Sequence, residues 1–561
     1  MRKFTLLCTF LLIVNYLTAQ NEAQEPENEF AFAIVNAAKN KKEGDVDKSS
    51  DKFKTAKKVF DKLVAARGDF RYPIPDFVMS DQEKKVAWMN YDRLEVGIEE
   101  KAYNVCMKFG ADSEAALAML LGHELSHYYE KHNWRREFAR QYYDLAVGKD
   151  LGVMTRADSV FNETQADYVG GFLAFSAGYP VFDKGAELTE ALYKAYKFPN
   201  ALRIYPILEE RKELNRRSAQ LIDRLVNIFE TANLLTATGD YESAEKYYQY
   251  ILQDYQSPSL YNNAGVMAVM AALDIYRDPA INYLVPVELD LNSIGSRDGG
   301  NKVVYFSFLQ QALRHFDAAI NLNPDYAPSY LNKACVLTLL HDKKRSKYLA
   351  ELEIPAVLEH DTAKLFQKTA TDLKVLNGIL AWEDGDSTKA DKIFQDLMKN
   401  ESSEIAGENL ARLRTKKPSE KNRTSSNSGN IETIDDIDLF MDVQDIKIYS
   451  DQRVYIAPGM KFYQNNEPKE KGSSKYFKTE REKSGKKEVH YFLVTKPGYK
   501  GKTAAGLKVG SSEQDLLKEY KSPNRKIEST RGQIWVYENI IFFLENNPKP
   551  EISGWALFFD E

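Results

Sequence analysis

Five consecutive residues carry the clearest chemical pattern in the chain. His123-Glu124-Leu125-Ser126-His127 is an H-E-x-x-H pattern, and the apolar run just before it, 115–121, predicts a buried helix. Positions i and i+4 of a helix share one face about 6 Å apart, so two imidazoles there can bind one metal ion while Glu124 points at a bound water. The chain has only 7 histidines, which makes an accidental match improbable. The alternative is a packed histidine pair in a core helix.

A catalytic zinc ion normally has three protein ligands and a fourth position for water, so one ligand must come from another element. Glu163 and Asp167 are again four positions apart and lead into an apolar helix. One carboxylate can therefore bind the metal while the other orients a ligand histidine. Gly122, Gly170 and Gly171 would let the two helices approach closely.

His132 follows the same helix but does not extend the motif. The longer metzincin pattern requires Gly at position 130 and His at position 133, where this chain has Glu130 and Asn133. We therefore expect His132 to be a surface residue.

Three motifs in order give the chain a resemblance to a known family. H-E-L-S-H, then E-T-Q-A-D-Y-V-G, then S-A-G-Y-P resembles the gluzincin peptidases related to HtpX and the CAAX prenyl endopeptidase, over about residues 85–215. The resemblance implies that Zn²⁺ is bound by His123, His127 and Glu163. It also implies that Glu124 is the general base and that Asp167 supports a ligand from behind.

The chain departs from this family at one position. The family often has H-P-x-x-x-x-R downstream, whereas this chain has Tyr205-Pro206 and then Arg211 at the corresponding positions. The Tyr205 hydroxyl is a candidate catalytic donor to a developing oxyanion. The same side chain can equally be a packed structural residue.

The elements that position these residues belong to a chain of several domains. It has 561 residues, 43% hydrophobic and 28% charged, which excludes collagen-like, wholly disordered and multi-span membrane classes. A net charge of −6 gives no basic surface, so we expect no nucleic-acid partner. Without a C-x-x-C pair there is no Cys-ligated zinc site, and Cys106 and Cys335 form either one disulfide or two buried thiols.

The N-terminus has the layout of a secretory signal peptide. A basic start at 1–3, an apolar run at 4–17 and a small-residue exit at 18–20 predict cleavage after about residue 20. A retained anchor is the alternative, but the run is short for a bilayer. We expect an exported protein, periplasmic or extracellular, with no transmembrane span once the signal is removed. Residues 21–52 form a polar lead-in.

The predicted metallopeptidase domain covers 53–224 and is mainly helical, with a strand at 95–107 where apolar residues alternate. Helical pairs then recur over 225–413, with small residues where two helices touch and aromatic residues where pairs meet, as in tetratricopeptide repeats. The positions that fit are Ala232, Gly239, Ala244, Tyr248, Tyr261, Gly265, Ala312, Phe316, Ala319, Pro324, Tyr330, Ala334, Gly378, Gly385, Ala390 and Phe394. Any helical hairpin is the alternative. An insertion between Tyr276 and Ser307 predicts a loop at the edge of the repeat surface.

Residues 414–435 predict a flexible linker that decouples the last domain, and 436–561 predict a β-rich α+β domain. The expected strands are 453–456, 489–494, 533–537, 540–544 and 555–559. Residues 506–520 resemble the strand, turn and capped helix of SmpA/OmlA-like modules, with Ser511 or Ser512 as the cap. A generic α+β domain fits these residues equally well.

The fold prediction is therefore a multidomain chain with a gluzincin-type α+β zinc metallopeptidase domain, a tetratricopeptide solenoid and a C-terminal β-rich domain. The order of the first two resembles that of periplasmic BepA-like proteases. This implies a zinc endopeptidase of envelope protein quality control whose repeats present protein or peptide substrates and bind envelope proteins. The alternative is a non-catalytic repeat scaffold or chaperone that retains a metallopeptidase fold.

Overall fold

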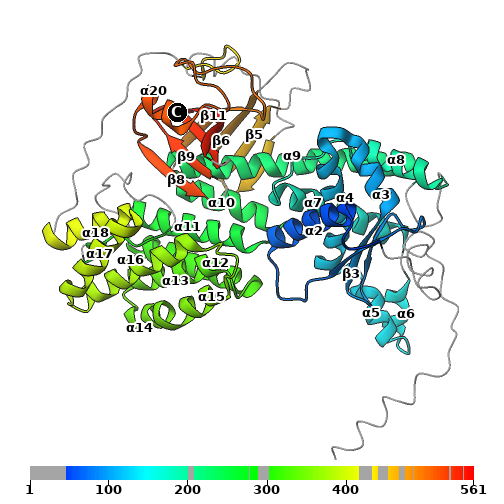
Figure 1. Ribbon diagram of the computed structural model, residues 1–561, viewed down its shortest axis with the longest axis horizontal. Coiled ribbons are helices and arrows are strands. Elements are labelled where there is room, and N and C mark those ends of the chain that lie inside the picture. Colours follow the sequence, from blue (N-terminus) through cyan, green and yellow to red (C-terminus); the bar gives the residue numbers. More distant parts are fainter. Residues whose placement is uncertain are drawn as a thin grey trace, which may run out of the picture.

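The structure is a computed structural model that describes residues 46–153, 155–199, 207–276, 278, 280–287, 302–415, 432–439, 453–465, 474–483, 485–529, 532–546 and 549–561. These residues form a mostly helical body and a separate eight-stranded antiparallel sheet (Figure 1). None of the helices in the described ranges is long and apolar enough to cross a membrane. The predicted signal peptide, Tyr205 and most of the predicted linker lie outside the described residues.

The N-terminal region packs helices around a small sheet. Its strands have the order β1-β3-β2, with β1 parallel and β2 antiparallel to β3, so β2 is an edge strand. The strands are β1 (Asp76–Ser80), β2 (Ala87–Asn90) and β3 (Glu95–Glu99). The helices are α2 (Asp51–Arg67), α3 (Glu100–Cys106), η2 (Met107–Asp112), α4 (Ser113–Tyr129), α5 (Trp134–Gln141), α6 (Ala146–Gly152), α7 (Arg156–Ser176) and α8 (Gly185–Tyr196).

The prediction of one strand over 95–107 is wrong for its second half. The chain leaves β3 after Glu99 and enters α3, where the buried residues are Ala102, Tyr103, Val105 and Cys106. Burial at spacings of one, three and four is that of a helix face rather than the alternation of a strand. The spacing of apolar residues in so short a segment does not distinguish a strand from a helix.

Helical pairs fill the middle of the chain. They are built from α9 (Leu208–Thr238), α10 (Tyr241–Leu252), α11 (Pro258–Ile275), α12 (Lys302–Leu322), α13 (Ala327–Leu339), α14 (Lys343–Tyr348), η4 (Leu349–Glu353), α15 (Ile354–His360), α16 (Gln367–Glu383), α17 (Ser387–Glu401) and α18 (Glu404–Thr415). Two pairs use the same contact. A Cβ on Gly265 would lie 2.5 Å from the Phe316 ring, and one on Gly378 would lie 2.5 Å from the Phe394 ring. A glycine thus accepts an aromatic ring at the crossing of α11 with α12 and of α16 with α17.

The predicted loop between Tyr276 and Ser307 is shorter than expected, because α12 begins at Lys302. Its described part packs on later helices of the same region. The Tyr283 hydroxyl donates to Glu383 of α16 at 2.6 Å, and the Asn409 side chain of α18 bonds both backbone groups of Leu284 at 2.8 and 2.9 Å. This segment, which follows α11 in the sequence, is therefore held against α16 and α18 by hydrogen bonds.

The C-terminal sheet has the order β4-β5-β6-β7-β11-β10-β9-β8. Its strands are β4 (Arg453–Ala457), β5 (Met460–Asn465), β6 (Ser474–Lys483), β7 (Lys486–Thr495), β8 (Arg525–Ser529), β9 (Gly532–Val536), β10 (Ile540–Asn546) and β11 (Pro550–Asp560), so each predicted strand segment lies almost wholly within a strand. Ser512 caps α20 (Glu513–Tyr520) through a capping box with Asp515. The strand expected near residue 507 is absent from this described stretch, which forms turns instead.

The two faces of this sheet are covered differently. One face is covered by α20 and by the segment around Ile434, which is fully buried although it was predicted to belong to the linker. The opposite face, with Phe462 and Phe492 at its centre, joins the hydrophobic core of the helical body. Figure 1 shows the sheet lying along α9 and α10.

Polar contacts hold the sheet to α9 and α10. Lys475 of β6 donates to Asn227 at 2.9 Å and pairs with Glu230 at 3.1 Å. At the C-terminal end of α9, the buried Arg525 donates to the carbonyls of Thr236 and Ala237 at 2.9 and 3.1 Å. The prediction that the last domain is decoupled from the rest is therefore wrong. A polar linker shows only that two segments are not continuous, and it does not exclude docking between them.

The two cysteines of the described chain are free. Cys106 lies in α3 and Cys335 in α13, and both side chains are fully buried. Of the two alternatives left open by the sequence, the structure has two buried thiols. Burial raises the pKa of Cys106 to about 12, so this thiol stays protonated and unreactive at neutral pH.

His490 predicts how docking of the sheet depends on pH. Its Nε2 lies 3.1 Å from Asp240 at the N-terminus of α10, and its Nδ1 lies 2.7 Å from Asp560. Asp240 also pairs with Arg481, which contacts Glu242 and Glu488. Burial opposes charging of the imidazole, but the hydrogen bonds to the two aspartates outweigh it and raise the pKa of His490 to about 9.

A pKa raised on folding stabilises the folded state below the unfolded pKa, near 6.5 for histidine, and this contribution disappears as the pH rises through 9. We expect the melting temperature to fall between pH 7 and pH 10 by more in the wild type than in His490→Gln, with at most about 3 kcal/mol at stake. Calorimetry of both proteins at the two pH values measures this. An equal fall in both would contradict the assignment.

Candidate metal centre

The candidate centre is positioned by two helices, α4 and α7, that touch at glycine residues. A Cβ on Gly122 of α4 would lie 2.7 Å from the backbone carbonyl oxygen of Gly170 in α7. A Cβ on Gly170 would lie 2.6 Å from the backbone nitrogen of His123. Real side chains do not fit at such distances, so only glycine permits this crossing. Gly171 meets a third helix instead, because its Cβ would lie 2.2 Å from Ile222 of α9. The expected close approach of α4 and α7 is confirmed for Gly122 and Gly170 and is wrong for Gly171, which faces α9.

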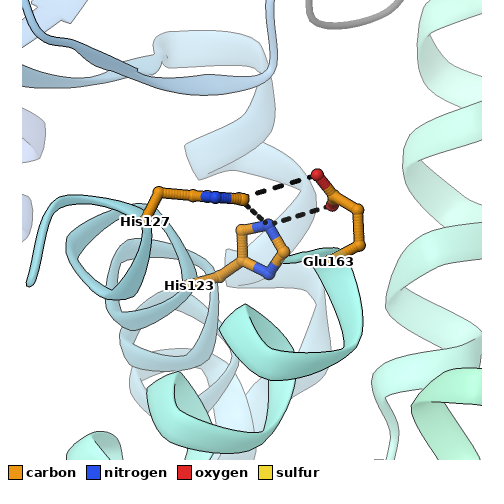
Figure 2. Close-up of side chains that lie close together, drawn as sticks. All are labelled: His123, His127 and Glu163. Carbon is orange, nitrogen blue, oxygen red and sulfur yellow. Dashed lines mark hydrogen bonds and ion pairs between the residues drawn. The ribbon is translucent and has the colours of Figure 1, made fainter. Parts of the chain in front are cut away.

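The close crossing brings three side chains together (Figure 2). The His123 and His127 Nε2 atoms lie 3.0 Å apart, and Glu163 places its carboxylate oxygens 3.3 Å from the first and 3.6 Å from the second. Two ligand atoms of a tetrahedral zinc ion are each about 2.0–2.1 Å from it, and therefore about 3.3 Å from one another. The three atoms thus already have the spacing of a zinc site, and His/His/Glu is a donor set that zinc uses.

Asp167 lies behind His123 rather than beside the three ligand atoms. Its Oδ1 accepts a hydrogen bond from His123 Nδ1 at 2.7 Å, and its Oδ2 accepts one from Asn215 at 2.8 Å. The side-chain oxygen Oδ1 of Asn215 in turn accepts a hydrogen bond from the Thr189 hydroxyl at 2.6 Å. Of the two carboxylates that the sequence left as alternatives, Glu163 faces both imidazoles and Asp167 orients one of them.

Arg211 and Asn215 belong to the centre although sequence reasoning assigned neither a role. Both lie in the first turns of α9, and the Arg211 guanidinium bonds Glu163 at 3.1 Å and Asp167 at 3.3 Å. The downstream P-x-x-x-x-R pattern was the available signal for Arg211. Asn215 follows it by one helical turn and therefore lies on the same face. Tyr205 lies outside the described residues, and its proposed role stays a prediction.

The expectation for His132 is wrong. This side chain is half-buried, and its Nδ1 lies 2.7 Å from the Nδ1 of His127. The chain leaves α4 through Lys131, which has φ +55°, and the His132 amide bonds back to the His127 carbonyl at 3.2 Å. This left-handed turn folds the chain back over the end of α4, so a residue five positions after His127 can reach it. Motif spacing along a continuous helix does not reveal such a turn.

Burial and charge set the protonation of the centre. Burial disfavours a charge on His123, but the hydrogen bonds that it donates to Asp167 and Glu163 outweigh this effect and raise the pKa of His123 to about 10. Burial lowers the pKa of His127 to about 3. Burial also raises the pKa of Glu124 to about 7, although this carboxylate accepts a backbone hydrogen bond from Met89. A carboxylate with a pKa near 7 is suited to accept and return a proton at neutral pH.

The centre opens into a cavity of about 280 Å³. One wall is the edge strand β2 with the residues just before it, and the rest of the lining comes mostly from α4, α7, α8 and α9, with Arg136 of α5 and the turn after α4. Away from the ligands the lining is mostly apolar and includes Met119, Leu120, Leu188, Leu192 and Phe198, together with polar side chains such as Lys85, Arg136 and Thr189. The cavity therefore has a polar end at the three ligand atoms and a mostly apolar end beside them.

Comparison with known proteins adds no assignment. No protein-family model matches the chain, and no curated protein matches it. The interpretation of the centre therefore depends on its own geometry.

The glycine contact gives a direct test of this geometry. Gly170→Ala should force α7 away from α4, because the new Cβ has no space, and should cost about 1–3 kcal/mol of unfolding free energy. Affinity for a divalent metal should fall as well, since Glu163 moves with α7. Chemical denaturation and metal titration measure the two effects.

Gly407→Ala is the matched control. It is also a helical Gly→Ala change, but its Cβ would lie 3.6 Å from the Met398 side chain, an ordinary contact. The free energy of unfolding of Gly407→Ala should stay within about 1 kcal/mol of the wild-type value. If Gly170→Ala behaves like this control, the tight crossing does not determine the site.

Proposed function

We propose that the protein is a zinc-dependent endopeptidase. The observation that carries this proposal is the arrangement around one cavity of three possible ligand atoms at the spacing that zinc requires, the neighbouring Glu124 carboxylate and the edge strand β2. Zinc bound to such ligands supplies Lewis-acid chemistry and makes water a nucleophile near pH 7.

Glu124 is the proposed general base. It follows the ligand His123 directly in α4 and lines the same cavity, so it can accept the proton of the attacking water and pass it to the leaving amine. Its raised pKa of about 7 favours both transfers. Arg211 pairs with Glu163 and Asp167, so it offsets the negative charge that these two carboxylates concentrate beside the histidines.

The edge strand β2 is the proposed binding site for the substrate backbone. Only β3 pairs with it in the small sheet, and its residues line the cavity beside His123 and Glu124. An extended peptide can add to such an edge through main-chain hydrogen bonds, while a pocket binds one of its side chains. Because the pocket is mostly apolar away from the ligands, we propose peptides with a large apolar residue next to the cleaved bond as substrates.

The setting of the activity is part of the proposal. The signal-like N-terminus supports an exported, periplasmic or extracellular enzyme, and helical pairs with tetratricopeptide-like spacing support the docking of protein substrates or envelope proteins. The function proposed is therefore envelope protein quality control. A scaffold or chaperone without turnover is the alternative, and the following experiment separates the two.

Glu124→Gln should retain one zinc ion per chain and lower kcat/KM on a casein-type substrate by about 100- to 10,000-fold, because the ligands stay and the base is lost. His127→Ala should lose both zinc and activity. Metal analysis beside a proteolysis assay measures both. Glu114→Gln, an exposed change on the same helix, is the control and should match the wild type. Unchanged proteolysis in Glu124→Gln, or none in the zinc-bound wild type, would contradict an endopeptidase.

The apolar end of the cavity predicts the side-chain preference. Replacing Leu or Phe by Ala beside the cleaved bond of a peptide should lower kcat/KM by about 10- to 200-fold, as loss of apolar contact does in other enzyme pockets. Leu192→Phe should reduce the space and shift the preference towards smaller residues. Competition between peptides in one reaction measures the ratio. A ratio unchanged by Leu192→Phe would show that this cavity does not select the substrate.

A further inference from the structure

We infer that His132 is a positioning residue that fixes the tautomer of His127, and that Gln165 and Glu130 in turn fix His132. This inference rests on the zinc site proposed above. It concerns a hydrogen-bonded chain that starts far from the ligands and ends at the ring nitrogen behind His127.

These hydrogen bonds link five side chains, which come from three helices and from the turn after α4. Arg67 of α2 pairs with Glu130 at 3.2 Å, and Gln165 of α7 donates from its amide nitrogen to Glu130 at 3.3 Å. The Gln165 oxygen lies 3.1 Å from His132 Nε2, and His132 Nδ1 lies 2.7 Å from His127 Nδ1. The far end is anchored, because the Arg67 guanidinium also lies 5.0 Å from the Tyr129 ring and 5.2 Å from the Tyr255 ring.

The direction of every hydrogen bond in this series follows from Glu130, because an ionised carboxylate can accept a hydrogen bond but cannot donate one. A Glu130 carboxylate paired with an arginine can only accept, so the amide nitrogen of Gln165 must face it. The Gln165 oxygen then faces His132 and can only accept, so His132 donates from Nε2. A neutral His132 therefore accepts at Nδ1, and His127 must donate from its own Nδ1.

The consequence is at the opposite nitrogen of His127. With its proton on Nδ1, the ring presents an unprotonated Nε2, which is the atom that faces His123 and Glu163. Asp167 holds His123 in a similar way by accepting from its Nδ1, so Nε2 is the His123 nitrogen that faces His127 and Glu163. The two histidines are thus prepared by different partners, a carboxylate behind His123 and an imidazole behind His127.

An uncharged partner behind His127 has an electrostatic reason. Glu163 and Asp167 already bring two negative charges to the centre, and Arg211 is the cation that contacts both of them. A further carboxylate behind His127 would add to the negative charge that Glu163, Asp167 and Glu124 already bring there. An imidazole directs the His127 proton without that charge.

Three variants test the inference through metal affinity and spectroscopy. His132→Leu removes the acceptor and should weaken Zn²⁺ binding by about 10- to 100-fold, the usual effect of losing a partner behind a metal-ligating histidine. His132→Asn retains an acceptor near the Nδ1 position and should restore affinity to within about threefold of the wild type. Gln165→Leu should also weaken binding, because His132 is then free to adopt the other tautomer.

The measurements are competition with a chelator of known affinity and the visible absorption of the Co²⁺-substituted protein, whose bands report ligand geometry. His360→Leu replaces an exposed histidine of α15 and should change neither. Circular dichroism identifies any variant that fails to fold. Should His132→Leu be one of these, the comparison of His132→Asn with Gln165→Leu still decides.

The outcomes separate this inference from the proposed function. Unchanged affinity and Co²⁺ spectrum in His132→Leu or in Gln165→Leu would overturn the positioning role while leaving the peptidase proposal in place. His132→Asn that binds as weakly as His132→Leu would show that the imidazole acts through packing alone, which also overturns it. A wild type that binds no zinc would overturn the metal site itself.

Discussion

The contact between Gly122 and Gly170 is the constraint on which the centre depends. Two helices without side chains at their crossing can approach until backbone meets backbone, and this places Glu163 against the two imidazoles of α4. Carboxylates on helices usually point to solvent. Here the short distance between the helix axes leaves Glu163 buried beside histidines and an arginine, which hold its pKa well below the ordinary value although burial acts in the opposite direction.

Helix α9 joins the three parts of the molecule. Its first turns supply Arg211 and Asn215 to the candidate metal centre, its middle contacts α7 at Gly171, and its last turns contact the C-terminal sheet. A helix of 31 residues is about 46 Å long at 1.5 Å per residue. The same helix therefore carries Arg211 near one end and contacts the C-terminal sheet near the other.

The sequence predicted what local patterns determine. The H-E-x-x-H spacing predicted His123 and His127 as metal ligands, and the carboxylates four positions apart left Glu163 and Asp167 as alternatives for the third. Only the resemblance to the gluzincin peptidases selected Glu163. The tetratricopeptide assignment and the peptidase activity stay predictions. The strand segments of the last domain were predicted because β-branched and aromatic residues bounded by Gly and Pro identify strands locally.

What the sequence did not predict depends on contacts between distant residues or on backbone conformation. His132 reaches the centre only because Lys131 adopts a left-handed conformation that its residue type does not indicate. The pairing of Asp240 with Arg481 joins positions 241 apart in the chain, and no local pattern relates them. A polar linker suggested independence, whereas these pairs and the shared core between them join the last domain to α9 and α10.

Arg525 has a consequence for how the protein is made. The last turn of a helix leaves carbonyl groups without partners inside the helix, and in α9 the buried Arg525 bonds those of Thr236 and Ala237. A ribosome synthesises that helix long before it reaches Arg525. During elongation, the Ala237 carbonyl and the apolar surface that the sheet later covers are open to water or chaperones. Completion of this part of the fold therefore waits for almost the whole chain.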